Sequence, residues 1–102
     1  MNVVDHAIEK LASVKKHKGM YFGDTVRDAE TFLQGFRQAL MAMGVPMTCD
    51  SEQILENRGW VQTSVGFSPS MRERGLSEAE IMDELVDALV EELRLASATF
   101  VE

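Results

Sequence analysis

The chain has 102 residues, of which 45% are hydrophobic and 26% charged, and its net charge of −7 argues against a nucleic-acid partner, which needs a basic surface. No apolar run approaches the roughly 20 residues of a membrane span, and the first ten residues are too charged for a signal peptide, so we expect no membrane partner. The length fits a single domain over residues 1–102, and the single cysteine, Cys49, makes a reducing cytoplasm the expected location.

Two amphipathic helices are predicted in the first half of the chain. Residues 3–17 place their apolar side chains on one side of a helical wheel and their polar ones on the other. The second helix spans residues 26–43, where Thr25 can cap its first turn and Gly44 can end it. All four lysines of the protein lie in or just beyond the second half of the first helix, where the helix dipole favours cations: Lys10, Lys15, Lys16 and Lys18.

The middle of the chain combines a short helix with a strand pattern. Asp50 and Gln53 form a capping-box pattern that opens a helix from Ser51 to Arg58. Residues 60–67 then alternate β-branched or aromatic residues with small polar ones, which is typical of a strand. Its candidate partners are residues 20–22 and 45–49, so we expect a small two-stranded antiparallel sheet.

The last third is predicted to hold a short and a long helix. Pro69 favours a helix start at Ser68, and Ser77 with Glu80 forms a capping box that opens a helix to about Ala98. The apolar residues of this long helix cover about 200° of its wheel, where an ordinary surface helix shows a stripe of about 100°. Since one neighbour within the chain would leave part of this face wet, we expect a homodimer through Met82, Val86, Leu89, Val90 and Leu93. The fold class is therefore mainly α, with four to five helices around one core.

The whole negative charge lies in the last quarter of the chain. Residues 78–102 hold eight acidic side chains against Arg94 alone. Five of the carboxylates form an acidic stripe along the long helix: Glu80, Asp83, Glu84, Asp87 and Glu91. This stripe fits three readings: a solvated face that keeps the protein soluble, a surface for a basic protein partner, or a surface covered by the lysine cluster of residues 10–18, in the same chain or across a dimer.

The string Gly19-Met20-Tyr21-Phe22-Gly23, followed by Asp-Thr, resembles an element near the N-terminus of the ATPase subunit of type II topoisomerases. It is also similar to an element of small uncharacterised bacterial proteins, some of which occur in mobile gene cassettes. The topoisomerase resemblance implies ATP hydrolysis, but the asparagine-bearing helix and the glycine-rich phosphate loops of that family have no counterpart in this sequence. The string then serves either as a turn that seals the core or as part of a ligand cleft.

Catalytic and metal-binding patterns are weak. Cys49 would need a nearby base to act as a nucleophile, and His6 and His17 are about 16 Å apart along one helix, too far apart to act as a pair. Met41, Met43, Met47 and Cys49 offer soft ligands for Cu(I), but methionine is a common core filler. Residues of the acidic stripe would need further ligands to hold a divalent cation. We expect no catalytic residue, metal or cofactor.

These observations together predict a non-enzymatic protein-interaction module. Its expected interaction surface is the acidic stripe, with a basic protein as the candidate partner. The alternative is a small-molecule-binding module, whose aromatic and methionine-lined cleft would use Tyr21, Phe22, Met43 and Trp60.

Overall fold

The fold of the protein is mainly helical, as predicted. The computed structural model describes residues 3–23, 25–47 and 51–97, with Ser51 and Ser97 described for the backbone only. Within these ranges there are six helices: α1 (Val3–Lys16), α2 (Lys18–Phe22), α3 (Val26–Ala42), α4 (Ser51–Asn57), α5 (Ser68–Glu73) and α6 (Glu78–Ser97). This exceeds the expected four to five, because the Gly-Met-Tyr-Phe string is itself a helical turn, α2.

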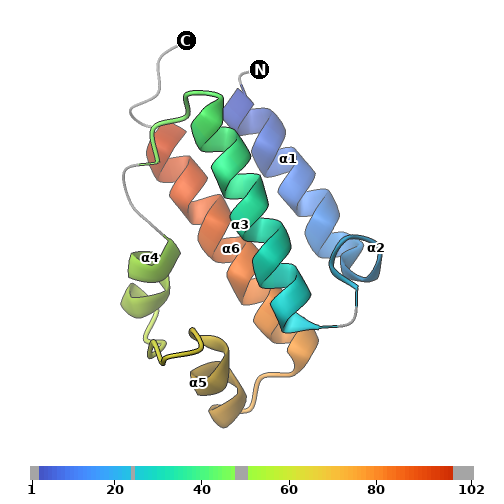
Figure 1. The fold of residues 1–102 in the computed structure, drawn as a ribbon, viewed down its shortest axis with the longest axis vertical. Coiled ribbons are helices and arrows are strands. Elements are labelled where there is room, and N and C mark those ends of the chain that lie inside the picture. The colour runs from blue at the N-terminus through green and yellow to red at the C-terminus, as the bar shows by residue number, and fades with distance from the viewer. Residues whose placement is uncertain (1–2, 24, 48–50, 98–102) are drawn as a thin grey trace.

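Helix α6 is the centre of the architecture. The three long helices lie side by side, with α1 antiparallel to α6 and α3 parallel to it (Figure 1). The short helices α4 and α5 also contact α6, while α2 packs against α1 and α3. Helix α6 is therefore packed against α1, α3, α4 and α5.

The predicted caps are confirmed at the starts of two long helices, α3 and α6. The Asp28 amide donates a hydrogen bond of 3.1 Å to Thr25 Oγ1 at the start of α3. At the start of α6, the Ser77 amide donates to Glu80 Oε1 (2.9 Å), and the Glu80 amide donates to Ser77 Oγ (3.2 Å). The second arrangement is a complete capping box, which satisfies two amides that the helix itself leaves free. Asp50, the expected cap of α4, lies outside the described residues.

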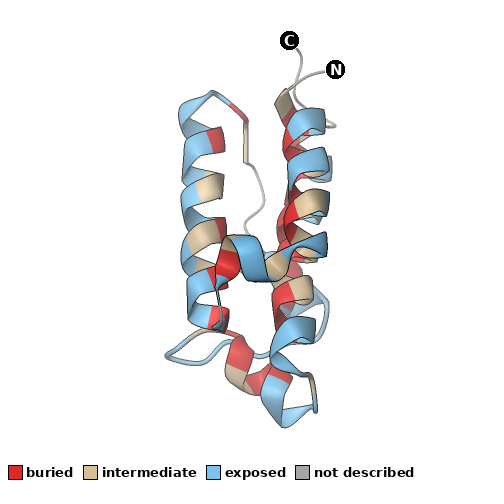
Figure 2. Cartoon of the chain, turned by 90° about the vertical axis from the view of Figure 1, so that its right-hand side faces the viewer, coloured by how far each residue is buried: buried red, intermediate tan, exposed pale blue. Residues whose placement is uncertain are grey.

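The wide apolar face of α6 is covered by the chain's own helices. Of the side chains assigned to a dimer interface, Met82, Val86, Leu89 and Leu93 are at most 5% exposed, and Val90 is half-buried. Figure 2 shows buried positions gathered on the facing sides of the long helices. A homodimer was predicted on the premise that α6 has one neighbour within the chain, but α6 contacts four other helices. Its apolar width is therefore explained without a second chain, and these side chains offer no free interface.

The prediction of a strand at residues 60–67 is wrong. The described residues contain no strand there, and an isolated bridge between Thr63 and Gly66 closes a tight turn instead. The Thr63 amide donates to the Gly66 carbonyl (2.8 Å), and the Gly66 amide donates to the Thr63 carbonyl (3.1 Å). Val61 and Val65 are 64% and 71% exposed, so the alternation does not mark a buried face. Of the expected partner segments, residues 20–22 lie in α2, residues 45–47 have no regular structure, and residues 48–49 lie outside the described ranges.

Candidate functional site

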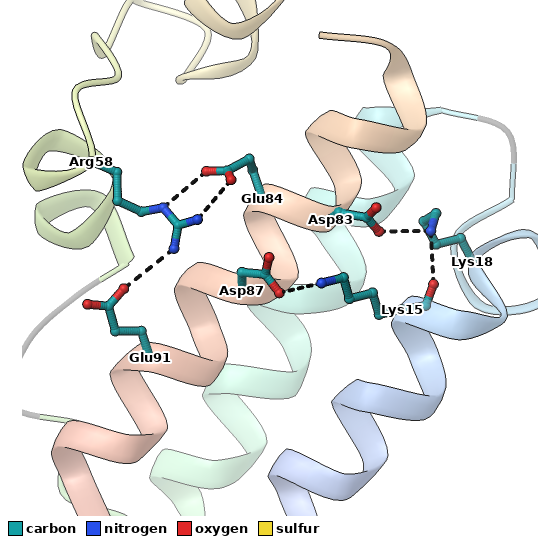
Figure 3. Close-up of polar contacts among 7 residues, drawn as sticks. All are labelled: Lys15, Lys18, Arg58, Asp83, Glu84, Asp87 and Glu91. Carbon is teal, nitrogen blue, oxygen red and sulfur yellow. Dashed lines mark hydrogen bonds and ion pairs between the residues drawn. The ribbon is translucent and has the colours of Figure 1, made fainter.

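One side of the acidic stripe binds the lysines that end α1 and begin α2. Lys15 Nζ lies 2.9 Å from Asp87 Oδ1, and Lys18 Nζ lies 2.8 Å from Asp83 Oδ1 (Figure 3). Lys18 also donates to the Lys15 carbonyl at 2.9 Å, so the two cations are positioned together. The hydrogen bond to Asp87 raises the pKa of Lys15 above its ordinary value. These contacts attach the end of α1 to the first half of α6.

The other side of the stripe binds α4 and the segment after it. Arg58 donates two hydrogen bonds to Glu84, from Nη2 to Oε1 at 2.8 Å and from Nε to Oε2 at 3.1 Å. Trp60 Nε1 donates to the same carboxylate at 2.9 Å. The Arg58 guanidinium also approaches Glu91, with an N–O distance of 3.6 Å (Figure 3). Glu84 is thus the acceptor that holds the α4 side of the molecule on α6.

The acidic stripe is therefore occupied within the chain. Four of its carboxylates pair with Lys15, Lys18 or Arg58, and the fifth, Glu80, completes the capping box. The Ser77 amide lowers the pKa of Glu80 by donating a hydrogen bond to its carboxylate. Of the three readings of the stripe, the structure shows coverage by the chain's own cations. The lysine cluster contributes two of its members.

The four residues of the predicted ligand cleft do not come together. Phe22 is buried and meets Phe32 edge to face, with ring centroids 5.4 Å apart. Tyr21 packs against the same phenylalanine and accepts a hydrogen bond of 2.9 Å from Lys10. The Gly-Met-Tyr-Phe string therefore seals the core between α1 and α3, which was the other reading of this motif.

The remaining two members of that predicted cleft lie elsewhere. Met43 caps the far end of α3 and is 64% exposed. It borders a shallow apolar hollow of about 260 Å³ between α1 and α3. Trp60 contacts the α6 side through Glu84, and its ring is covered by the Arg74 guanidinium, 4.4 Å from the ring centroid. A cleft built from these four residues is not present.

A different cleft lies between α3, α4, α6 and the turn at residues 60–67, and we call it the α3–α4 cleft. Its volume is about 460 Å³, within the range of about 300–1,000 Å³ that ligand sites occupy. Its apolar lining comes from all of these elements: Leu33, Leu55, Phe67, Leu85 and Leu89. Its polar lining is Glu30, Gln34, Arg37, Gln38, Glu52 and Gln62, with Gly66 beside Glu30. An apolar base with a polar border suits binding of an amphipathic group.

Two charged residues of α3 mark the wall of this cleft. Arg37 Nε donates a hydrogen bond of 2.6 Å to Glu92 Oε1, and the Glu92 side chain is fully buried. Glu30 lies two turns before Arg37 on α3, and its carboxylate lies against Gly66. Partial burial raises the pKa of Glu30, and the charges of Arg72 and Arg27 only partly offset this. The cleft therefore holds one compensated cation and one partly desolvated carboxylate.

This cleft leaves only a diffuse signal in the sequence, and none of the predicted sites includes it. Glu30, Leu33 and Arg37 are spaced i, i+3 and i+7, so they share one face of α3. On a helical wheel, Glu30 and Arg37 lie outside the apolar stripe of residues 26–43. Charged residues that flank a leucine at this spacing were the one available indication of a mixed surface.

No group of three or more His, Cys, Asp or Glu side chains in residues 3–23, 25–47 and 51–97 is arranged to hold a metal ion. None of the helices in these ranges has the length and apolarity needed to cross a membrane. Comparisons of the chain with protein-family models, with curated proteins and with solved structures gave no match. Function must therefore be argued from the geometry.

Proposed function

We propose that this protein is a non-enzymatic protein-interaction module and that its partner binds in the α3–α4 cleft. The observation that carries this proposal is the cleft itself: about 460 Å³ of open space over five apolar side chains, bordered by amides and carboxylates. Sites that receive an apolar group usually combine such a base with a few polar groups that orient the ligand. No described buried side-chain nitrogen or oxygen lacks a hydrogen-bond partner, so the buried polar groups are satisfied without a ligand.

The same proposal assigns a structural role to the acidic stripe. A basic partner at the stripe would compete with Lys15, Lys18 and Arg58, which already lie 2.8–2.9 Å from three of its carboxylates. Displacing them would remove polar contacts that align α1 and α4 on α6, so that binding would lower the stability of the fold. The stripe is better suited to aligning the helices than to receiving another protein.

A non-enzymatic role fits the lining of the cleft. Its ionisable members are Glu30, Arg37 and Glu52. Arg37 is engaged with Glu92 and cannot act as an acid or a base near neutral pH. Two carboxylates without a nucleophile among the described lining residues support binding of charge rather than a proton-transfer reaction.

Nuclear magnetic resonance can test the location of the site. A ¹⁵N-labelled sample is titrated with a panel of capped tripeptides that carry Phe, Leu or Met at both ends, up to millimolar concentration. We expect shifts at the amides of Leu33, Leu55 and Phe67. Gln38→Trp should fill the cleft from its exposed lip and suppress these shifts, whereas Ala12→Trp, on the exposed face of α1, should leave them unchanged. Shifts that are absent, or confined to another surface, would refute the proposal.

A further inference from the structure

The α3–α4 cleft carries a carboxylate, Glu30, whose burial is only partly offset by the charges of nearby arginines. No ion pair is seen for Glu30 within the part of the chain that the structure describes. The cation that acts on it most strongly, Arg72, is bound to Glu78 by two hydrogen bonds of 2.9 Å. Glu30 therefore faces the cleft without a neutralising side chain of its own.

The other charges of the cleft do not cancel Glu30. Arg37 is the single cation among the described lining residues, and the buried Glu92 already balances it at 2.6 Å. Glu52 adds a second carboxylate from α4, on an exposed side chain. The described lining residues thus include two carboxylates, Glu30 and Glu52, and one guanidinium that is already paired with Glu92, so a cationic ligand complements the lining better than an anionic one.

Amide side chains occupy two walls of the same cleft. Gln34 and Gln38 are exposed one turn apart on α3, and Gln62 lies on the turn at residues 60–67. Each amide can both donate and accept a hydrogen bond, as a peptide backbone does. This lining suits an extended peptide, whose backbone needs both kinds of partner along its length.

We infer that the occupant of the cleft is a segment of a partner protein in which Lys or Arg neighbours an apolar side chain. The apolar side chain covers Leu33 and Phe67, and the cation lies at Glu30. This inference rests on the proposed function, because it specifies the ligand of the same cleft. Burial raises the pKa of the Glu30 carboxyl, and a bound cation would favour its ionised form.

The test compares three capped peptides that differ at one position: acetyl-Phe-Lys-Leu-amide and its norleucine and glutamate counterparts. Affinities are measured from amide shifts of the ¹⁵N-labelled protein at low ionic strength. We expect the lysine peptide to bind about twofold to fivefold more tightly than the norleucine peptide, as partly exposed ion pairs allow. Glu30→Gln should bring this ratio close to one. Glu9→Gln, which removes an exposed carboxylate from α1, should leave the ratio unchanged.

The outcomes separate this inference from the proposed function. Equal binding of the lysine and norleucine peptides in the cleft would overturn the inference and leave the cleft as the binding site. If no peptide shifted the cleft amides, both would fail. If lysine-dependent shifts appeared at Asp83 and Asp87 instead, the cation would bind to the acidic stripe and the inference would be wrong. A free amine, 4-phenylbutylamine, that bound more tightly than the lysine peptide would identify a small molecule as the occupant and likewise overturn it.

Discussion

Arg37 and Glu92 join α3 to α6 through a hydrogen bond of 2.6 Å between Nε and Oε1. The carboxylate is fully buried, while the arginine side chain is 22% exposed and lines the α3–α4 cleft. One guanidinium thus compensates a charge in the core and also lines the cleft. The wall of the cleft is consequently fixed by the interior of the protein rather than by a loop.

Replacement of this arginine should destabilise the fold strongly. Arg37→Met removes the guanidinium that donates to the fully buried Glu92 carboxylate, and removing one partner of a buried ion pair costs about 3–5 kcal/mol. Urea unfolding followed by circular dichroism would measure the change in the free energy of unfolding. Arg27→Met, an exposed arginine of the same helix, should change it by no more than about 0.5 kcal/mol. A similar small effect for both variants would contradict the assigned role of the pair.

The lysine contacts of the acidic stripe should contribute modestly and in a salt-dependent way. The double variant Asp83→Asn, Asp87→Asn removes both pairs, whose side chains are about a third exposed. We expect a loss of about 1 kcal/mol, because partly exposed pairs contribute about 0.2–1 kcal/mol each. The loss should shrink in 1 M NaCl, where the Debye length is about 3 Å. Glu56→Gln, on the exposed side of α4, serves as the matched control, and a salt-independent loss would contradict the electrostatic explanation.

The capping box at the start of α6 should contribute more to the free energy of unfolding than its exposed position suggests. Ser77→Ala removes the oxygen that accepts from the Glu80 amide, and loss of such a cap costs about 0.5–2 kcal/mol. Thermal unfolding would report the change as a lower Tm. Ser64→Ala, at an exposed position of the turn, should have no comparable effect. Equal Tm values for the two variants would show that the cap does not stabilise α6.

Acid should weaken the same helix start. Hydrogen bonds from Arg72 and from the Ser77 amide lower the pKa values of Glu78 and Glu80, respectively, below their ordinary value of 4.5. Their ionised forms therefore stabilise the folded state fully above pH 4.5, and this contribution is lost as the pH falls through the lowered values. Urea titrations at pH 6, 4 and 3 should show this decline. The decline should be smaller in Glu80→Gln, which keeps a side-chain acceptor at every pH.

Glu30 should behave in the opposite sense. Since burial raises its pKa in the folded state, the unfolded chain loses this proton first as the pH rises, which favours unfolding above the ordinary value of 4.5. Glu30→Gln should therefore make the protein more stable at pH 7 and equally stable at pH 3. A binding residue often carries such a cost in stability. A destabilised Glu30→Gln protein at pH 7 would show that Glu30 has a structural role instead.

The sequence predicted those features that neighbouring residues determine. Thr25 and Ser77 mark helix starts through contacts three residues away, and the apolar faces of α1, α3 and α6 follow from the helical period alone. The prediction of a strand was wrong because Val61 and Val65 follow the period of a strand, but no described segment pairs with them and both are exposed. A period identifies a buried face only when another element covers it.

The site depended on contacts that a single sequence does not specify. The lysine cluster and the acidic stripe were both recognised, but the choice among their readings required the alignment of α1 against α6. In that alignment residues separated by 65 and 72 positions meet, Lys18 with Asp83 and Lys15 with Asp87. The α3–α4 cleft likewise depends on three elements that meet on α6.

The central place of α6 has a consequence for synthesis of the protein on the ribosome. Helices α1, α3, α4 and α5 all contact the helix that is translated after them, so their apolar faces have no permanent cover until residue 97 has left the exit tunnel. A fragment of residues 1–76 should therefore remain unfolded or aggregate. In the complete chain, the amides of the three long helices should exchange their hydrogens together, as one cooperative unit.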